Sequence, residues 1–89
     1  MQRKQQTTVQ TIRMYSTTWC GDCRRSKRFL KEHHISFEEI DLEQDPEATE
    51  LVMSLNHGRR IIPTIIFPDG SVLVEPSNLA LASKLGIQL

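Results

Sequence analysis

Thr18-Trp19-Cys20-Gly21-Asp22-Cys23 is the stretch that decides the fold of this chain, and it holds both cysteines of the sequence. The apolar run before it predicts a strand at about 11–15, and the basic run after it predicts a helix at about 21–33. A Cys-x-x-Cys pair at such a strand-to-helix junction is typical of a redox site. Residues three apart on a helix share a face, so Cys20 and Cys23 can meet and close a short disulfide loop.

The place of Cys20 predicts its chemistry. If Cys20 caps the helix, its sulfur lies among unpaired backbone N–H groups at the positive end of the helix dipole. Both features favour the thiolate, which is the attacking species in disulfide exchange. Cys23 lies one turn further along the helix and receives less of this stabilisation. We therefore expect Cys20 to be the nucleophile and Cys23 to resolve the mixed disulfide.

The first helix has a basic side, for which two interpretations stay open. The basic residues are Arg24, Arg25, Lys27, Arg28 and Lys31. In the simpler interpretation they form a solvated face. In the other, they favour the Cys20 thiolate and attract an anionic thiol substrate. Asp22 opposes the thiolate, and an Asp22–Arg25 ion pair would mute that effect.

The size and charge of the chain argue against several classes of protein. Its 89 residues predict one domain at 11–89 behind a polar tail at 1–10. Eleven basic and eleven acidic residues give zero net charge, which argues against a nucleic-acid partner. No apolar run approaches the roughly 20 residues that span a bilayer, so we expect no membrane partner. The N-terminus shows no apolar secretory segment, so we expect a cytoplasmic protein, in which structural disulfides are rare.

The middle of the chain predicts a strand at about 36–42 and a helix after it. Asp45-Pro46-Glu47 opens this helix, because aspartate is a good cap and proline suits the first turn. We expect Gly58 to end the helix as its C′ residue. Apolar residues at i, i+3, i+4 and i+7 predict one buried stripe, made of Ala48, Leu51, Val52 and Leu55.

The segment after this helix predicts a hairpin. Pro63 marks the start of a strand that continues through 64–67, since proline cannot lie inside a central strand. Residues 68–71 have the composition of a turn and lead to a strand at 72–74. The two strands therefore form an antiparallel hairpin.

The C-terminal segment predicts a third helix. Ser77 caps it and Gly86 ends it. Its buried residues are expected to include Leu79, Ala82 and Leu85. The predicted order of elements is β-α-β-α-β-β-α.

This order, with Cys20-Gly21-Asp22-Cys23 after the first strand and Ile62-Pro63-Thr64 opening the third, resembles the thioredoxin fold in its small glutaredoxin form. The resemblance covers about residues 10–87. It implies an α/β protein with a four-stranded mixed sheet and helices on both faces. Within the family, Met14 to Cys23 and Phe67 to Ser71 look most like the mycoredoxins, the actinobacterial branch that works with mycothiol.

The resemblance also implies residues that bind the substrate. In this family the proline at the position of Pro63 is cis and faces the active disulfide, so the backbone of Ile62 would hold the substrate beside Cys20. Trp19 and Tyr15 are further candidate contacts. Trp19 could instead cap the core beside the loop, and Tyr15 could be an ordinary strand residue.

Two further candidates would bind the carboxylate of a small thiol. Ser77 and the N–H groups at the start of the last helix form one side of such a site. Arg60, or its neighbour Arg59, would supply a charge-assisted contact from the other side. Glutathione-using relatives usually have a basic residue where this chain has Thr17, and a Gly-Gly pair where it has residues 75–78. These departures leave the identity of the small thiol open.

The expected activity is that of a thiol–disulfide oxidoreductase. It would reduce mixed disulfides between proteins and a low-molecular-weight thiol, mycothiol or glutathione, through the dithiol site of Cys20 and Cys23. The small thiol is a co-substrate, so we expect no bound cofactor. We expect a monomer whose partners are the small thiol and oxidised or S-thiolated client proteins.

Other functions are less well supported by the sequence. One is a general protein disulfide reductase of the thioredoxin type. Another is a non-enzymatic iron–sulfur carrier, a dimer bridged through Cys20 of each chain, as in some glutaredoxins. A metal site within one chain is disfavoured, because structural zinc takes four ligands and the histidines lack suitable spacing: His33, His34 and His57. An electron donor dedicated to ribonucleotide reductase would usually carry a tryptophan near the last helix, which this chain lacks.

Overall fold

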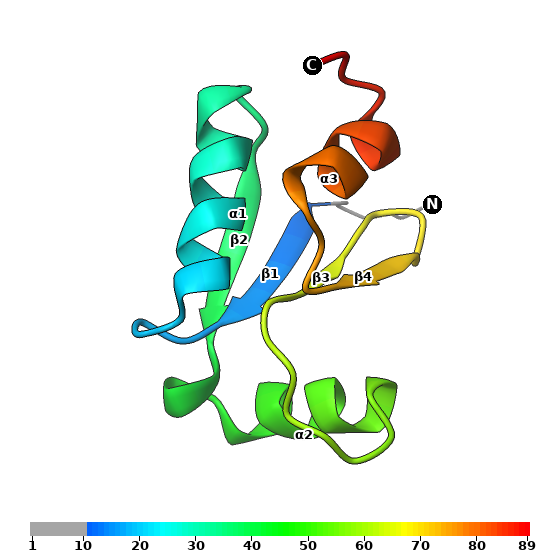
Figure 1. The fold of residues 1–89 in the computed structure, drawn as a ribbon. Helices are drawn as coiled ribbons and strands as arrows, with labels where there is room; N and C mark the ends of the chain where they lie inside the picture. The colour runs from blue at the N-terminus through cyan, green and yellow to red at the C-terminus, as the bar shows by residue number, and fades with distance from the viewer. Residues whose placement is uncertain (1–10) are drawn as a thin grey trace, which may run out of the picture.

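The computed structural model describes residues 11–89, which form a four-stranded sheet with helices on both faces (Figure 1). The expected polar tail at 1–10 lies outside the described residues. The element order is the predicted β-α-β-α-β-β-α, with a short 3-10 helix, η2 (Leu42–Gln44), before the second α-helix. The predicted order and the mixed sheet are confirmed.

The sheet has the strand order β2-β1-β3-β4. β1 (Ile12–Ser16) pairs in parallel with β2 (Phe37–Asp41) on one side. On its other side β1 pairs antiparallel with β3 (Thr64–Ile66), which forms a hairpin with β4 (Val72–Val74). A parallel pair needs a crossover connection, which α1 (Gly21–Glu32) provides between β1 and β2.

The helices bury two separate apolar clusters against the sheet. Figure 1 shows α1 and α3 (Asn78–Leu85) on one side of the strands and α2 (Pro46–Leu55) on the other. Side chains of a strand alternate between faces, so Met14 points toward α1 and α3 while Tyr15 points toward α2. The first cluster includes Met14, Phe29, Leu30, Ile65 and Leu81. The second is made of Tyr15, Leu42, Ala48 and Val52.

The starts of α2 and α3 follow the sequence prediction. The carboxylate of Asp45 accepts a hydrogen bond from the N–H of Ala48 over 3.0 Å, and Pro46 occupies the first turn. Oγ of Ser77 accepts a hydrogen bond from the N–H of Ala80 over 3.0 Å. Each cap satisfies a backbone donor that a helix leaves unpaired at its N-terminus.

The end of α2 differs from the prediction. The helix ends at Leu55 with Asn56 as its C-cap, so Gly58 is not the C′ residue. His57 takes the left-handed C′ position instead, with a φ of 57°, and the N–H of Gly58 donates to the carbonyl of Met53 over 2.7 Å. The buried side chain of Asn56 donates to the carbonyl of Val52 over 2.8 Å and to Oγ1 of Thr64 over 3.2 Å. Leu55, in the last turn, is 40% exposed and does not belong to the buried stripe.

The buried side of α3 also differs from the prediction. Leu79 is 70% exposed, whereas Leu81 is fully buried. Leu81, Ala82 and Leu85 pack on the apolar cluster under α1 and α3. Leu79 lies about 200° around the helix from Leu81, so it faces away from that cluster. Gly86 ends the helix as predicted, in the left-handed conformation with a φ of 71°.

Candidate active site

Cys20 lies at the junction between β1 and α1. It is the N-cap of α1, with an extended backbone at φ −90° and ψ 118°. Its Sγ accepts a hydrogen bond from the backbone N–H of Cys23 over 3.1 Å. The residue is half-buried, so a disulfide from solution can reach the sulfur. The N–H group and the helix dipole both favour negative charge at this position.

Cys23 lies in the first turn of α1 and is 1% exposed. Burial raises the pKa of its thiol to about 12, and its hydrogen bond with the side chain of Cys20 adds to the rise. The negative charges of Cys20 and Glu39 act in the same direction, whereas a backbone hydrogen bond from Thr17 lowers the pKa. The two thiols therefore differ in access and in environment: Cys20 can be approached, and Cys23 holds its proton.

The segment before β3 contains a cis peptide bond between Ile62 and Pro63. Pro63 is buried, and its carbonyl accepts a hydrogen bond from the N–H of Glu75 over 2.8 Å. Oγ1 of Thr64 donates a hydrogen bond to the carbonyl of Ile61 over 2.7 Å. These two contacts hold the segment against the end of the hairpin.

A shallow pocket of about 370 Å³ brings together three of the residues expected to bind substrate. Trp19 is 62% exposed, so it does not cap the core. Its Nε1 donates a hydrogen bond to an oxygen of Glu43 over 3.4 Å, and the same oxygen lies 3.8 Å from the guanidinium of Arg60. The lining residues are Trp19, Arg59, Arg60, Ile61, Ile62 and Glu75.

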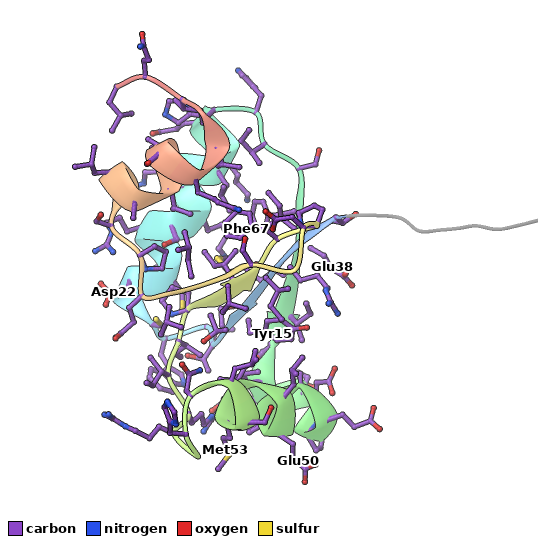
Figure 2. All side chains as sticks on the ribbon, turned by 90° about the vertical axis from the view of Figure 1, so that its right-hand side faces the viewer. Tyr15, Asp22, Glu38, Glu50, Met53 and Phe67 are labelled. Atoms are coloured by element: carbon purple, nitrogen blue, oxygen red, sulfur yellow. The ribbon has the colours of Figure 1, made fainter. Side chains whose placement is uncertain are left out.

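Tyr15 and Ser77 do not line this pocket. Tyr15 is 3% exposed and packs with Ala48 and Val52 between the sheet and α2 (Figure 2). Tyr15 therefore lies on the α2 side of the sheet, apart from the shallow pocket, and lines a separate pocket with Arg13 and Ala48. Ser77 is exposed at the start of α3, where its Oγ serves as the helix cap.

The basic side of α1 makes specific contacts near the cysteines. Arg25 forms the expected ion pair with Asp22 over 3.0 Å, at the exposed start of the helix (Figure 2). Its other nitrogen donates to the carbonyl of Pro76 over 3.0 Å, which ties α1 to the segment before α3. Arg24 donates to the carbonyl of Thr18 over 3.2 Å, in the loop that leads to Cys20.

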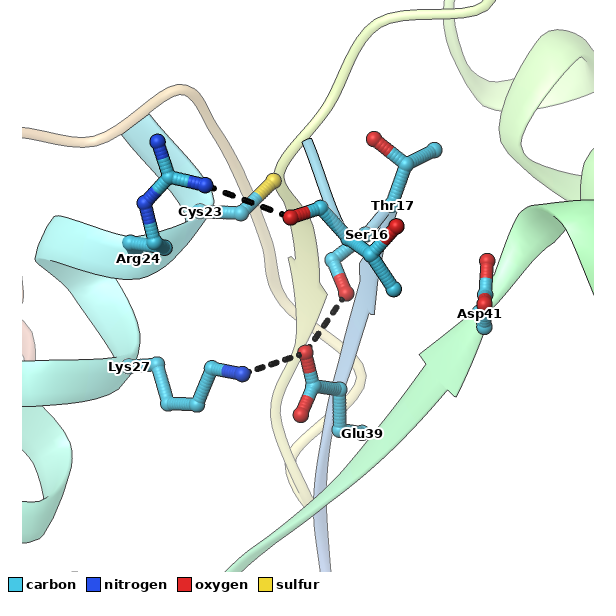
Figure 3. Close-up of a pocket in the computed structure, with 8 residues that line it drawn as sticks. Ser16, Thr17, Cys23, Arg24, Lys27, Glu39 and Asp41 are labelled. Carbon is cyan, nitrogen blue, oxygen red and sulfur yellow. Dashed lines mark hydrogen bonds and ion pairs between the residues drawn. The ribbon is translucent and has the colours of Figure 1, made fainter. Parts of the chain in front are cut away.

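A second pocket, of about 320 Å³, is lined by Cys23 and was not predicted from the sequence (Figure 3). Nζ of Lys27 lies 3.0 Å from Oε2 of Glu39, and Oγ of Ser16 donates to the same oxygen over 3.0 Å. These contacts join α1, β1 and β2, so no local spacing in the sequence marks them. We call this the Cys23 pocket, and its lining residues are Ser16, Thr17, Thr18, Cys23, Arg24, Lys27, Glu39 and Asp41.

The histidines take no part in either pocket. The ring of His33 packs on that of Phe29 with centroids 4.3 Å apart, and His34 and His57 are exposed residues with positive φ. Within residues 11–89 no group of three or more His, Cys, Asp or Glu side chains is placed to hold a metal ion. In that same part of the chain, no helix has the length and apolar character needed to cross a membrane.

Known proteins are similar to this chain in both sequence and fold. The Glutaredoxin family model matches residues 12–73. A protein of Mycobacterium tuberculosis that carries the name glutaredoxin is 42% identical over 74 residues, which cover 83% of this chain and 88% of that protein. Mycoredoxin 1 of Corynebacterium glutamicum is 34% identical over 77 residues, which cover 86% of this chain and 95% of that protein.

The structural likeness extends beyond the family match. The crystal structure of a variant of a thioredoxin-like protein has a TM-score of 0.74 and 26% sequence identity, covering 90% of this chain and 100% of the other. The family match itself runs from β1 into β4 and includes Cys20, Cys23 and Pro63. The chain therefore belongs to the glutaredoxin family, on the side of its mycoredoxin branch, and is a disulfide oxidoreductase of the glutaredoxin type.

Proposed function

We propose that this oxidoreductase reduces mixed disulfides between client proteins and a low-molecular-weight thiol, with Cys20 as the nucleophile. Either Cys23 or a second molecule of the small thiol then releases Cys20. The observation that supports this assignment is the unequal setting of the two sulfurs. Cys20 is half-buried at the N-cap of α1, where its Sγ accepts the N–H of Cys23 over 3.1 Å. Cys23 is 1% exposed, so an incoming disulfide meets Cys20 first.

The reaction proceeds by two exchanges. In the first, the Cys20 thiolate attacks the sulfur of the small thiol, a bond forms between these two sulfurs, and the client sulfur leaves as a thiolate. In the second, another molecule of the small thiol attacks that bond and releases Cys20. Cys23 can release it instead, by forming a disulfide with Cys20, which two molecules of the small thiol then reduce by two further exchanges. The two electrons come from the small thiol, so no bound cofactor takes part.

Mycothiol is the small thiol that we favour, with glutathione as the alternative. The similarity to mycoredoxin 1 supports mycothiol. Thr17 is buried and offers no positive charge where glutathione-using relatives usually have a basic residue. The pocket of Trp19, Arg60 and Ile62 begins next to Cys20 in the chain and offers a stacking surface and a guanidinium to the bound thiol.

The proposal is tested by turnover of a mixed disulfide with two matched variants, Cys20→Ser and Cys23→Ser, each given mycothiol and glutathione in turn. We expect Cys20→Ser to lose all activity and Cys23→Ser to keep it with the preferred thiol. Retained turnover in Cys20→Ser would overturn the assignment of the nucleophile.

The same experiment distinguishes the proposed function from the alternative of a thioredoxin-type protein disulfide reductase. If Cys23→Ser accumulates as a stable mixed disulfide on Cys20, visible as a mass increase equal to the small thiol or client, then Cys23 is obligatory. The protein would then be a dithiol reductase of proteins rather than an enzyme that depends on a small thiol. Equal rates with both small thiols would argue against a preference for mycothiol.

A further inference from the structure

Resolution by Cys23 requires that its thiol lose a proton. Only the thiolate attacks a disulfide, and Cys23 is 1% exposed with a pKa raised by burial to about 12. At neutral pH the free thiolate of Cys23 is therefore scarce. A base that accepts the proton as the new sulfur–sulfur bond forms would remove this obstacle.

The Cys23 pocket holds such a base. Glu39, on β2, lines the pocket together with Cys23 (Figure 3). One carboxylate oxygen, Oε2, is held from two sides, by Nζ of Lys27 at 3.0 Å and by Oγ of Ser16 at 3.0 Å. The side chain of Glu39 is 34% exposed, so it contacts both the pocket and solvent. A carboxylate in this position can take a proton from inside and release it outside.

The other charged groups of the pocket are less suited to this role. Arg24 and Lys27 on α1 are cations and cannot accept a proton. Asp41 is the remaining carboxylate, and its Oδ1 accepts the N–H of Glu43 over 2.9 Å as the cap of η2. Figure 3 shows Asp41 at the opposite side of the pocket from Cys23. No histidine is among the residues that line the pocket.

The pocket can also carry a proton through water. Its volume of about 320 Å³ is large enough to hold water, since one water molecule occupies about 30 Å³ in the liquid. Oγ1 of Thr17, which lines it, is buried without a hydrogen-bond partner among residues 11–89. Buried polar groups of this kind are commonly satisfied by water.

We propose that Glu39 accepts the proton of Cys23, directly or through water in the Cys23 pocket, when Cys23 resolves the mixed disulfide on Cys20. The step is balanced: Sγ of Cys23 forms a bond with Sγ of Cys20, the bond from Cys20 to the substrate sulfur breaks, and that sulfur leaves as a thiolate. The proton of Cys23 passes to Glu39 and then to solvent. This inference rests on the proposed roles of the two cysteines.

Lys27 and Ser16 act as positioning residues in this step. Both bind the same oxygen of Glu39, which leaves its other oxygen, Oε1, unengaged by them. Ser16 is 1% exposed and lies in β1, so its hydroxyl is a fixed support for a side chain on the neighbouring strand. Lys27 holds the carboxylate from α1, the helix that also carries Cys23.

The test uses the chromogenic disulfide 5,5′-dithiobis(2-nitrobenzoate) in stopped flow with the reduced protein. Attack by Cys20 releases one thionitrobenzoate, and resolution by Cys23 releases a second. The first phase reports the proposed function, and the second reports the new inference. Cys23→Ser should show one release in place of two, which assigns the second phase.

We expect Glu39→Gln to slow the second phase at pH 7 by about tenfold or more, a modest effect for the loss of a general base. Its first phase should stay within about twofold of wild type. Between pH 6 and 9 the second phase of Glu39→Gln should rise by about tenfold per pH unit, because only solvent then takes the proton. The wild-type second phase should vary much less. Glu39→Asp should recover part of the rate.

A purely electrostatic role for Glu39 predicts the opposite change in the rate of the second phase. Its negative charge disfavours the Cys23 thiolate, so Glu39→Gln would then speed the second phase. Either that acceleration or an unchanged rate overturns the proposal. Glu38→Gln is the matched control, since Glu38 is the neighbouring exposed glutamate and lies on the other face of β2, outside the Cys23 pocket. Loss of the first phase in Cys23→Ser would instead contradict the proposed role of Cys20 as the nucleophile.

Discussion

Sγ of Cys20 and the backbone N–H of Cys23 are joined by a hydrogen bond of 3.1 Å across the first turn of α1. This one contact makes Cys20 both a helix cap and a candidate thiolate, because the group that caps the helix is also the group that reacts. It also sets the order of the two sulfurs, with Cys20 at the surface and Cys23 behind it.

The raised pKa of Cys23 predicts that the protein loses stability in alkaline solution. Its pKa in the folded protein is about 12, compared with 9.0 for a free thiol. Between these values the unfolded chain has lost the proton that the folded protein keeps, so the free energy of unfolding falls as pH rises. From pH 8 to 10 the loss should be about 1 kcal/mol.

The measurement is the difference in urea unfolding between wild type and Cys23→Ala, at pH 8 and pH 10 under reducing conditions. The comparison removes the contributions of all other ionisable groups, which both proteins share. We expect the stability advantage of wild type to shrink at the higher pH. A constant difference would mean that Cys23 ionises alike in the folded and unfolded chains.

The buried side chain of Asn56 should contribute strongly to stability. Its Nδ2 donates to the carbonyl of Val52 at the end of α2 and to Oγ1 of Thr64 at the start of β3. Asn56→Ala removes both bonds and leaves the carbonyl without that donor, at an expected cost of about 1–3 kcal/mol. Ser54→Ala is the control, since Ser54 is exposed and its Oγ donates only to the carbonyl of Leu51. Chemical unfolding that gave equal losses for the two variants would contradict this role.

The ion pair between Asp69 and Lys84 should affect how the free energy of unfolding depends on pH in acidic solution. Nζ of Lys84 lies 2.7 Å from Oδ2 of Asp69, and together with Ser71 it holds the pKa of that carboxyl far below its usual range. A lowered pKa in the folded state stabilises the protein above the unfolded pKa, and this contribution is lost as pH falls. In Lys84→Met the pKa of Asp69 should rise toward its ordinary value.

Carboxyl-carbon NMR shifts followed against pH measure the Asp69 pKa directly. Lys31→Met, which removes a charge from the end of α1, serves as the control and should leave Asp69 unchanged. An Asp69 pKa that stayed equally low in Lys84→Met would assign the effect to the hydrogen bonds from Ser71, over 2.9 Å from its N–H and 2.6 Å from its Oγ.

Removing Glu43 should speed the reaction with anionic disulfides. Glu43 lies 3.8 Å from the guanidinium of Arg60 and also accepts the indole N–H of Trp19, so it screens the positive charge of the shallow pocket. Glu43→Gln should raise kcat/KM for an anionic mixed disulfide by about two- to fivefold at low ionic strength, and Arg60→Gln should lower it. The gain should fade above about 0.15 M salt, where such charges are screened. Glu47→Gln, an exposed change on α2, should have neither effect, and a salt-independent gain would exclude this explanation.

The sequence was a good guide wherever a structure depends on neighbours within a few residues. Cys20 at the start of α1, Asp45 and Ser77 as caps, and Gly86 as the end of α3 all follow from local backbone needs. The element order follows from the same signals. The contacts at the end of α2 could not be predicted in this way, because Asn56 bonds to Thr64, in a strand that only folding brings near.

The sequence by itself therefore determined the position of the cysteine pair, the helix caps and the order of elements, since each depends on contacts along a short stretch of chain. Only the tertiary structure decided which side chains surround that pair. It buries Tyr15 under α2, turns Leu79 toward solvent, and brings Glu39, Lys27 and Ser16 into one pocket with Cys23. The physical reason is that these contacts join residues far apart in the chain, through the pairing of β1 with β2 and the packing of α1 beside them.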